Sequence, residues 1–332
     1  MAIVWKPFDT VPNCFIATST FSFPSFWMSS KLLSMIFLFA ARTRNRGSVF
    51  TGKTPATRRL VTHRRRRPLR GSVEAVPYGE SIALDHCAVT FYPAGHVLGS
   101  AQTLVDTDFG RILYTGDLKT RAGFTSTPAL PVPADVLVLE STFGKPRYRF
   151  PDAAEVIAAM VAWCKDVLDG GATPVLLGYS LGKGQEILSA LAAAGLTIAL
   201  HPSSFGVTEV YRELGCDFPP YQRLGDVGPR PAVVIMPPTA RRDSLGDQLG
   251  VFKTAALTGW AMDRSLKDRL EVDAVFPLSD HADFEELCCY AEKVGASMTY
   301  TVLGFDEELA LHLRRRGLRA KPLAAIDQLR LF

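Results

Sequence analysis

Apolar and polar residues alternate along residues 88–92, which is the spacing of a half-buried β-strand. Three apolar runs bounded by glycine or polar turns cover residues 88–92, 111–115 and 135–139. Helical periodicity is nearly absent from this part of the chain. The pattern predicts that residues 73–145 supply strands and tight turns to a sheet-based domain.

From residue 151 the apolar residues recur at helical spacing, and strands and helices then alternate. The predicted helices cover residues 152–168 and 182–194, and the predicted strands cover residues 174–177, 197–200, 232–236 and 254–257. Such alternation is typical of a parallel α/β unit, which we expect at residues 146–272. Beyond it, strands at 274–278 and 298–303 and helices at 283–293 and 306–316 indicate that residues 273–332 rejoin the first domain.

Polar side chains follow three of the predicted strands in the first domain. His96 lies in a glycine-flanked turn after the strand at 88–92, Asp117 follows the second strand, and Glu140 ends the third. A histidine in such a turn is often structural when it is considered alone. Three strand ends that each deliver one polar group nevertheless indicate a candidate site.

Four short motifs carry these residues: AGHVLGSAQ around His96, YTGDLK around Asp117, LESTFG around Glu140 and LSDHAD around His281. With these motifs, the chain from about residue 73 to 331 resembles the metallo-β-lactamase-fold nucleases of the β-CASP group. It is most similar to bacterial exonucleases associated with an ATP-dependent DNA ligase, often labelled RNA 3′-end processing factors. The resemblance implies an αββα sandwich, residues 73–145 and 273–332, with a β-CASP α/β cap inserted at 146–272. It also implies zinc-dependent hydrolysis of phosphodiester bonds in DNA, or in RNA, and a role in DNA repair.

By this resemblance, His96 would bind one of two zinc ions and Asp117 would bridge both. Glu140 would orient and charge His281, which would donate a proton to the leaving oxygen. A neighbouring carboxylate raises the pKa of a histidine and fixes its tautomer, which suits general acid catalysis. The alternative is that residues 280–283 merely begin a helix with an aspartate N-cap.

Residues 178–184 lie between a predicted strand and a predicted helix and contain GYSLG, a G-x-S-x-G pattern. At this helix start, Ser180, Gly182 and Lys183 are suited to hold a substrate phosphate, and the related nucleases begin a cap helix with a similar Leu-Gly-Lys-x-Gln stretch. The alternative is a serine hydrolase with Ser180 as its nucleophile, although no HGGG-like segment precedes it. Its triad partners would be drawn from Asp273, Asp280, His281 and His312. A P-loop fits less well, because the spacing before Gly-Lys is one residue short.

Two departures from the family pattern bear on activity. The family's first metal motif, HxHxDH, is absent, and Leu303 stands where the family has its last metal-binding histidine. Leucine offers no lone pair, so the protein would supply only His96 and Asp117 to the zinc ions. We therefore expect a weak or inactive nuclease, and the alternative is a catalytically silent relative that still binds nucleic acid.

The parts of the chain before and after residue 73 differ in the sign of their net charge. Residues 1–73 contain 13 Lys and Arg and the single acid Asp9, so the remainder holds 24 basic and 32 acidic residues, and the two parts carry +12 and −8. We favour a shifted reading frame for residues 1–72, because the missing HxHxDH motif would fall there. A disordered basic arm and a targeting segment are the alternatives.

Composition also bears on the cellular environment. The most apolar N-terminal piece, residues 32–41, is ten residues long, whereas a bilayer-spanning helix needs about 20. The six cysteines form no CxxC pair and no even framework. We expect a cytoplasmic protein without a membrane partner.

Overall fold

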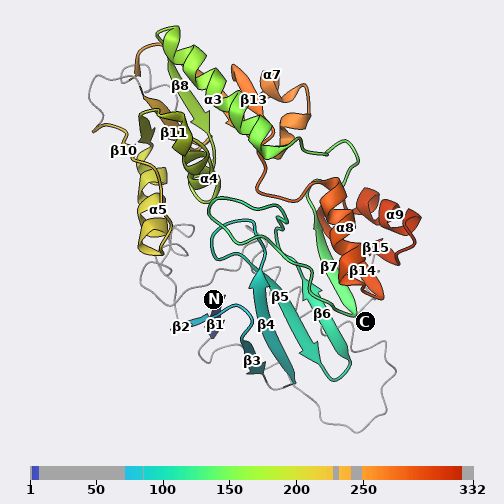
Figure 1. Cartoon of the computed structure of the whole chain (residues 1–332). Coiled ribbons are helices and arrows are strands. Elements are labelled where there is room, and N and C mark those ends of the chain that lie inside the picture. Colours follow the sequence, from blue (N-terminus) through green and yellow to red (C-terminus); the bar gives the residue numbers. More distant parts are fainter. Residues whose placement is uncertain (1, 7–71, 85, 227–231, 241–248, 324–332) are drawn as a thin grey trace, which may run out of the picture.

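The computed structural model describes residues 2–6, 72–84, 86–226, 232–240 and 249–323 (Figure 1). Most of the basic N-terminal segment therefore lies outside the described residues, and so do the hypotheses about it. Within the described part, β1 (Ala2–Lys6) pairs antiparallel with β2 (Ser72–Val76) as a separate two-stranded sheet. No helix in these ranges is both long enough and apolar enough to cross a membrane.

Seven strands form a mixed sheet in the order β15-β14-β7-β6-β5-β4-β3. Their bounds are β3 Ser81–Leu84, β4 Cys87–Pro93, β5 Ala101–Thr107, β6 Gly110–Tyr114, β7 Val136–Ser141, β14 Met298–Gly304 and β15 Ala320–Pro322. Strands β3 to β6 are antiparallel neighbours, whereas β6, β7, β14 and β15 run parallel. Because β14 pairs with β7, the chain returns to this sheet after a long excursion.

Two helices, α8 (Phe284–Val294) and α9 (Asp306–Arg315), cover one face of this sheet. Alternate residues of β7 point to opposite faces, so Leu137 and Leu139 pack against Leu287 and Leu309, whereas Val138 lies on the other face. Among the described residues, this part of the chain contains no second large sheet, so the αββα sandwich stays a prediction.

The excursion forms a six-stranded parallel sheet in the order β10-β9-β11-β8-β12-β13. Its strands are β8 Thr173–Leu177, β9 Ile198–Leu200, β10 Gln222–Arg223, β11 Val233–Met236, β12 Phe252–Leu257 and β13 Ala274–Phe276. Its helices are α3 Ala153–Asp169, α4 Lys183–Ala190, α5 Pro202–Glu213 and α7 Leu266–Leu270, with 3-10 turns η1 Ala192–Ala194 and η2 Gly259–Met262. The protein is thus a mixed α/β structure.

Helices α3 and α4 pack on the same face of the parallel sheet. Asp152 caps α3 by accepting a hydrogen bond from the Ala154 amide, and Met160 and Cys164 face Leu176 of β8. Fully buried parallel strands read as continuous apolar runs, which is why this unit is recognisable in the sequence.

The domain boundary at residue 272 stays a prediction, although the strand expected at 274–278 in the first domain pairs with β12 at the edge of the parallel sheet. Helix α5 was not predicted, although Pro202 stands at its first position and Val207, Val210 and Tyr211 are buried at helical spacing.

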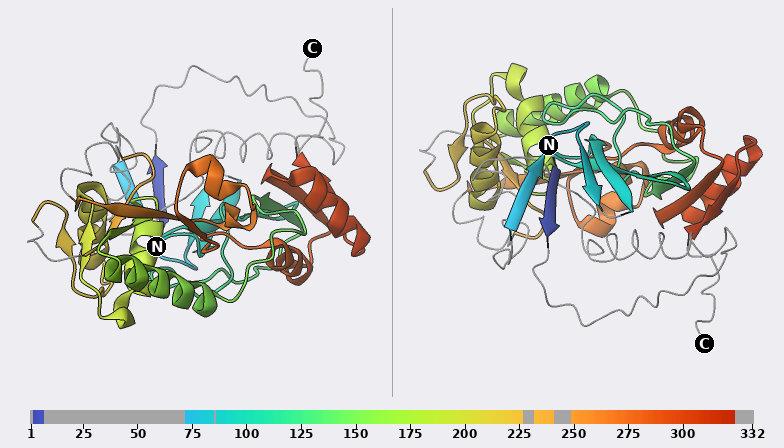
Figure 2. Two further views of the ribbon diagram at one scale, coloured as in Figure 1. Left: turned by 90° about the horizontal axis from the view of Figure 1, so that it is seen from above. Right: turned by 90° about the horizontal axis from the view of Figure 1, so that it is seen from below.

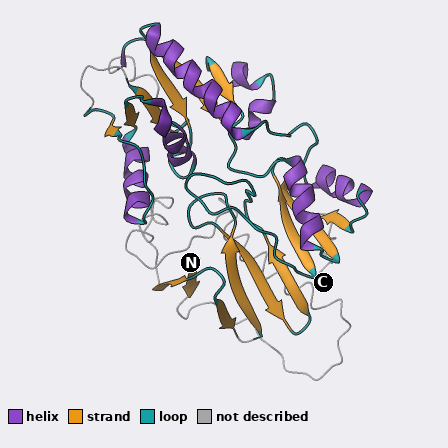
Figure 3. Ribbon diagram, in the orientation of Figure 1, coloured by secondary structure: helices purple, strands orange, loops and turns teal. Residues whose placement is uncertain are grey.

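The two sheets lie apart, and the loops that follow β4 and β6 lie between them (Figure 3). The views from above and below place α5 and α9 at opposite ends of the molecule (Figure 2). Packing between the halves includes Val97, which is buried against Val207 and Tyr211 of α5. The loops that carry the candidate site residues therefore meet at the junction of the two halves.

Candidate active site

His96 lies in the loop after β4, and this loop is packed tightly against the loop after β6. Gly95 has φ +81°, and a side chain there would overlap the Lys119 carbonyl oxygen, 2.0 Å from an added Cβ. Gly95 also forms an isolated antiparallel bridge with Leu118. Only glycine allows this approach, which places His96 Nε2 3.7 Å from Asp117 Oδ2.

The tautomer of His96 follows from its hydrogen bond. Nδ1 lies 3.0 Å from the backbone carbonyl oxygen of Asp280, which can only accept, so Nδ1 carries the proton. Burial and, secondarily, the positive charge of His281 lower the pKa of His96 and outweigh the nearby aspartates. His96 is therefore a neutral imidazole whose Nε2 lone pair lies on the side of Asp117. A free lone pair of this kind is what a metal ligand requires.

Glu140 and His281 form a buried ion pair. His281 Nδ1 lies 3.1 and 3.2 Å from the two carboxylate oxygens, and Glu140 also accepts hydrogen bonds from the Leu118 and Thr142 amides. Burial raises the pKa of Glu140, but the charge of His281 and these hydrogen bonds together lower it by more. The pKa of Glu140 therefore lies below its ordinary value. Burial lowers the pKa of His281, but the attraction and hydrogen bond of Glu140, together with the charges of Asp117 and Asp280, outweigh it and raise the pKa to about 10. Both partners are charged at neutral pH.

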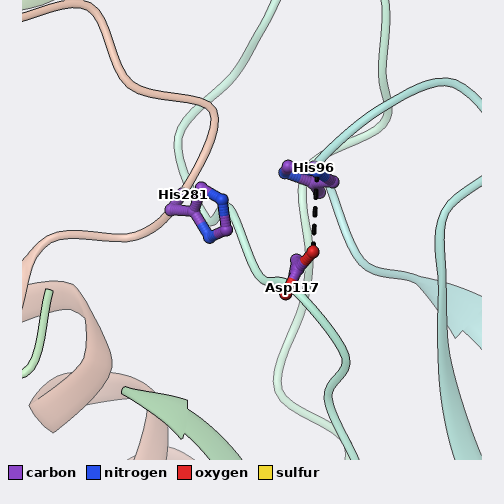
Figure 4. Close-up of side chains that lie close together, drawn as sticks. All are labelled: His96, Asp117 and His281. Carbon is purple, nitrogen blue, oxygen red and sulfur yellow. Dashed lines mark ion pairs between the residues drawn. The ribbon is translucent and has the colours of Figure 1, made fainter. Parts of the chain in front are cut away.

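His96, Asp117 and His281 lie together at the junction (Figure 4). One ligand atom from each falls within 4.8 Å of the others, and the two imidazole centroids are 4.6 Å apart. The three sequence motifs that carry these residues thus meet at one place, with Glu140 directly behind His281.

The donor set fits one divalent cation better than two. Ligands on a tetrahedral zinc with bonds of about 2.1 Å are about 3.4 Å apart, close to the 3.7 Å between His96 and Asp117. His281 is the third member of this group, and its Nδ1 bond to Glu140 is the kind of outer hydrogen bond that metal-binding histidines make, but the family resemblance gives it the role of proton donor. In the described ranges no second group of three metal-type side chains exists. Two zinc ions therefore do not fit the residues that the structure describes.

Ser180, Gly182 and Lys183 also lie beside the His96 loop, but they contact protein groups. Gly182 has φ +83°, and an added Cβ would lie 2.2 Å from Val97. Lys183 is only 3% exposed, and its ammonium group donates to the Leu278 carbonyl oxygen at 2.8 Å and lies 3.2 Å from the Asp280 carboxylate. The phosphate-binding role of these residues stays a prediction.

The groups considered for a serine hydrolase are not assembled around Ser180. The Ser180 hydroxyl lies 2.9 Å from the Ser203 hydroxyl, which lies 2.8 Å from His201 Nδ1. The candidate triad partners have other contacts: His281 with Glu140, Asp280 with Lys183, Asp273 with the Thr254 amide, and His312 with the Phe284 ring. The G-x-S-x-G pattern here is a loop-to-helix turn without the predicted triad.

Leu303 occupies a distorted end of β14. It has φ +64°, is 51% exposed, and sits where the pairing with β7 shifts register between Val302 and Gly304. A left-handed backbone is unfavourable for leucine by roughly 1–2 kcal/mol. The position thus keeps an unusual backbone conformation while presenting a side chain that cannot bind a metal.

Sequence reasoning missed a second buried ion pair next to the site. Lys119, two residues after Asp117, lies 2.8 Å from Glu186 of α4, and both side chains are 8% exposed. Spacing gave no signal for this pair, because 67 residues separate its members.

The chain is similar to proteins named as a DNA ligase and as ribonucleases. The chain is 41% identical over 258 residues to a "Probable DNA ligase" of Opitutus terrae, covering 77% of this chain and 25% of that protein. It is 35% identical over 121 residues to "RNase aCSPSF2" of Saccharolobus solfataricus, covering 36% and 24%, and 34% identical over 119 residues to "Endoribonuclease ysh1" of Emericella nidulans, covering 35% and 13%. No protein-family model matches. The chain spans a quarter or less of the length of these three curated relatives.

Proposed function

Because this chain belongs to the β-CASP group of metallo-β-lactamase-fold nucleases, we propose that it is a metal-dependent phosphodiester hydrolase that acts on DNA. The observation that carries the proposal is the meeting of His96, Asp117 and the Glu140–His281 ion pair at one junction. We assign the seven-stranded sheet with α8 and α9 to the metallo-β-lactamase domain. The six-stranded sheet, extended to residue 276, is its cap.

DNA is the favoured substrate, with RNA as the alternative. The match to a protein named as a DNA ligase supports DNA repair beside an ATP-dependent DNA ligase, whereas the matches to RNases support RNA. Zinc is the proposed cation, because a neutral imidazole and a carboxylate are common zinc ligands. Lys183 is less suited to a substrate phosphate than Ser180 and Gly182, since its ammonium is occupied.

The residues of the chain have separate roles in the proposed reaction. A bound divalent cation would supply Lewis-acid activation of the phosphodiester and of water, and His96 and Asp117 would hold it. Glu140 keeps His281 protonated and fixes its Nδ1 side. As a water oxygen forms a bond to phosphorus and the bond between phosphorus and the leaving oxygen breaks, His281 transfers its proton to the leaving oxygen. The proton that the water loses passes to solvent, from which His281 is protonated again.

Weak activity follows from the same geometry. With His281 serving as the proton donor, only His96 and Asp117 are left to hold the cation, which is fewer than the three protein ligands of a typical catalytic zinc site. A proton donor with a pKa of about 10 also lies well above the range that is best matched to neutral pH. The second candidate function, a silent nucleic-acid-binding relative, is favoured by Leu303 at the end of β14.

A cleavage and binding assay separates these functions. End-labelled single- and double-stranded DNA and RNA are incubated with the protein and zinc or manganese, and binding is measured by fluorescence anisotropy. We expect slow, metal-dependent DNA cleavage that His281→Ala abolishes and that the exposed control His86→Ala retains. Binding without cleavage would select the silent relative, and neither binding nor cleavage would overturn both proposals.

A further inference from the structure

The first turn of α4 contacts all three segments that build the site. Gly182, just before the helix, packs against Val97, the residue after His96. Lys183 reaches the segment that precedes His281, and Glu186 reaches the segment that follows Asp117. One helix of the parallel-sheet half therefore touches the three loops that carry His96, Asp117 and His281.

The Lys183 contact is the one that leads directly to a site side chain. Its ammonium group holds the segment at two points, the Leu278 carbonyl oxygen and the Asp280 carboxylate. The backbone carbonyl of Asp280 is in turn the group that accepts the Nδ1 proton of His96 at 3.0 Å. A lysine buried to this degree is costly to desolvate, so its place is maintained only by these partners.

We propose that Lys183 is a positioning residue for His96, because it fixes the Asp280 carbonyl that selects the imidazole tautomer. Without the ammonium group, the segment at 278–280 loses two anchors and the carbonyl no longer holds a fixed place beside His96. The tautomer of His96 would then no longer be fixed, and Nε2 would not be kept unprotonated for the cation. The inference that the fixed tautomer serves metal binding rests on the proposed function. The hydrogen bonds that fix the tautomer do not depend on that function.

The competing explanation is that Lys183 only holds α4 against the other half of the molecule. Another residue of α4 provides the control. Glu186 lies one turn further along the same helix and makes a comparably buried ion pair with Lys119. It also accepts from the Phe124 amide and the Thr125 hydroxyl. In the described part of the chain, Glu186 makes no hydrogen bond or ion pair with residues 278–280, so Glu186→Gln weakens the hold of α4 on the other half without releasing the Asp280 carbonyl.

The test is ¹⁵N NMR of histidine side chains in metal-free protein, with His96→Ala used to assign the signal. We expect His96 to be a neutral, Nδ1-protonated imidazole with a protected proton in wild type, Lys183→Arg and Glu186→Gln. In Lys183→Met the exchange rate of that proton rises by about tenfold or more, as expected when a positioning hydrogen bond is lost. Asp280→Asn, which keeps the carbonyl but loses the ion pair, gives the same change and serves if Lys183→Met does not fold.

An unchanged His96 tautomer and exchange rate in Lys183→Met or in Asp280→Asn overturns the proposal. An equal change in Glu186→Gln does so too, because it shows that adhesion of α4 is sufficient. The measurement needs neither metal nor substrate. A failure of the nuclease proposal would therefore appear in the cleavage assay and leave this result readable.

Discussion

The Nδ1 atom of His281 lies 3.1 Å from Oε1 of Glu140, although 141 residues separate the two in the sequence. Glu140 is completely buried at the end of β7, and His281 approaches it from the segment before α8. The whole six-stranded sheet lies between them along the chain. The contact therefore depends on the correct return of the chain to the first sheet.

Glu140→Gln should destabilise the protein most at neutral and mildly acidic pH. The folded pKa of His281, about 10, lies above its ordinary value of 6.5, so its contribution to stability is complete below pH 6.5 and is lost as the pH rises through about 10. Removing one partner of a buried pair costs on the order of 3 kcal/mol. Chemical unfolding at several pH values measures the free energy of unfolding of both proteins.

The difference between wild type and Glu140→Gln should shrink as the pH approaches 10. It should also shrink in acid, because the pKa of Glu140 is lowered and its contribution is lost as the pH falls below that value. The exposed Glu155→Gln on α3 is the matched control and should track wild type throughout. A pH-independent difference would contradict the ion pair.

Leu303→His should increase zinc affinity by about tenfold or more, since it adds an imidazole where the family resemblance places a metal ligand. Histidine also tolerates the left-handed backbone better than leucine. Isothermal titration with zinc measures the change. Leu303→Asn relieves the same backbone conformation without adding an imidazole, and an equal gain in that variant would show that backbone strain, not ligation, is responsible.

Ser180 should not react with a fluorophosphonate probe. Its hydroxyl is bonded to Ser203, and none of the predicted triad partners contacts it. Mass spectrometry of probe-treated protein measures adduct formation, with a known serine hydrolase as the positive control. An adduct on Ser180 that is lost in His201→Ala would revive the hydrolase alternative through a histidine that the sequence did not single out.

The regular elements were predictable because their apolar patterns are local. The strand expected at 88–92 is Cys87–Pro93, and the helix expected at 283–293 is Phe284–Val294, which begins at a capping box of Asp283 and Glu286. β5 was missed, although all of its first five residues are buried, because its apolar run includes Gln102 and Thr103. Gln102 side-chain bonds to the Pro93 and Leu130 carbonyls satisfy its buried amide, which no sequence pattern reveals.

The family of the chain was also predictable, because the short motifs around His96, Asp117, Glu140 and His281 occur in an order that is specific to the family. The comparisons confirm this resemblance. The contacts of Lys183 with Asp280 and Leu278 could not be predicted, because the partners lie far apart in the sequence. Lys183 and Leu278, for example, are 95 residues apart. Pairing of buried charges is set by how the two halves dock, and docking leaves no periodic trace in the sequence.

The hypothesis of a shifted reading frame for residues 1–72 makes a prediction about the underlying DNA. Translation of the other two frames upstream of the codon for residue 73 should give a segment that contains HxHxDH. The motif would restore the ligands that a two-zinc site needs. Absence of the motif from all three frames would exclude the frame shift and favour a basic arm that contacts phosphates.

The central claim is that the site is assembled but has too few ligands to retain two cations. Equilibrium dialysis against zinc, followed by elemental analysis of the purified protein, tests this claim most directly. We predict at most one equivalent of zinc per chain, lost on dialysis against a weak chelator, and none in a variant that combines His96→Ala with Asp117→Ala. Two tightly held equivalents per chain would contradict the account.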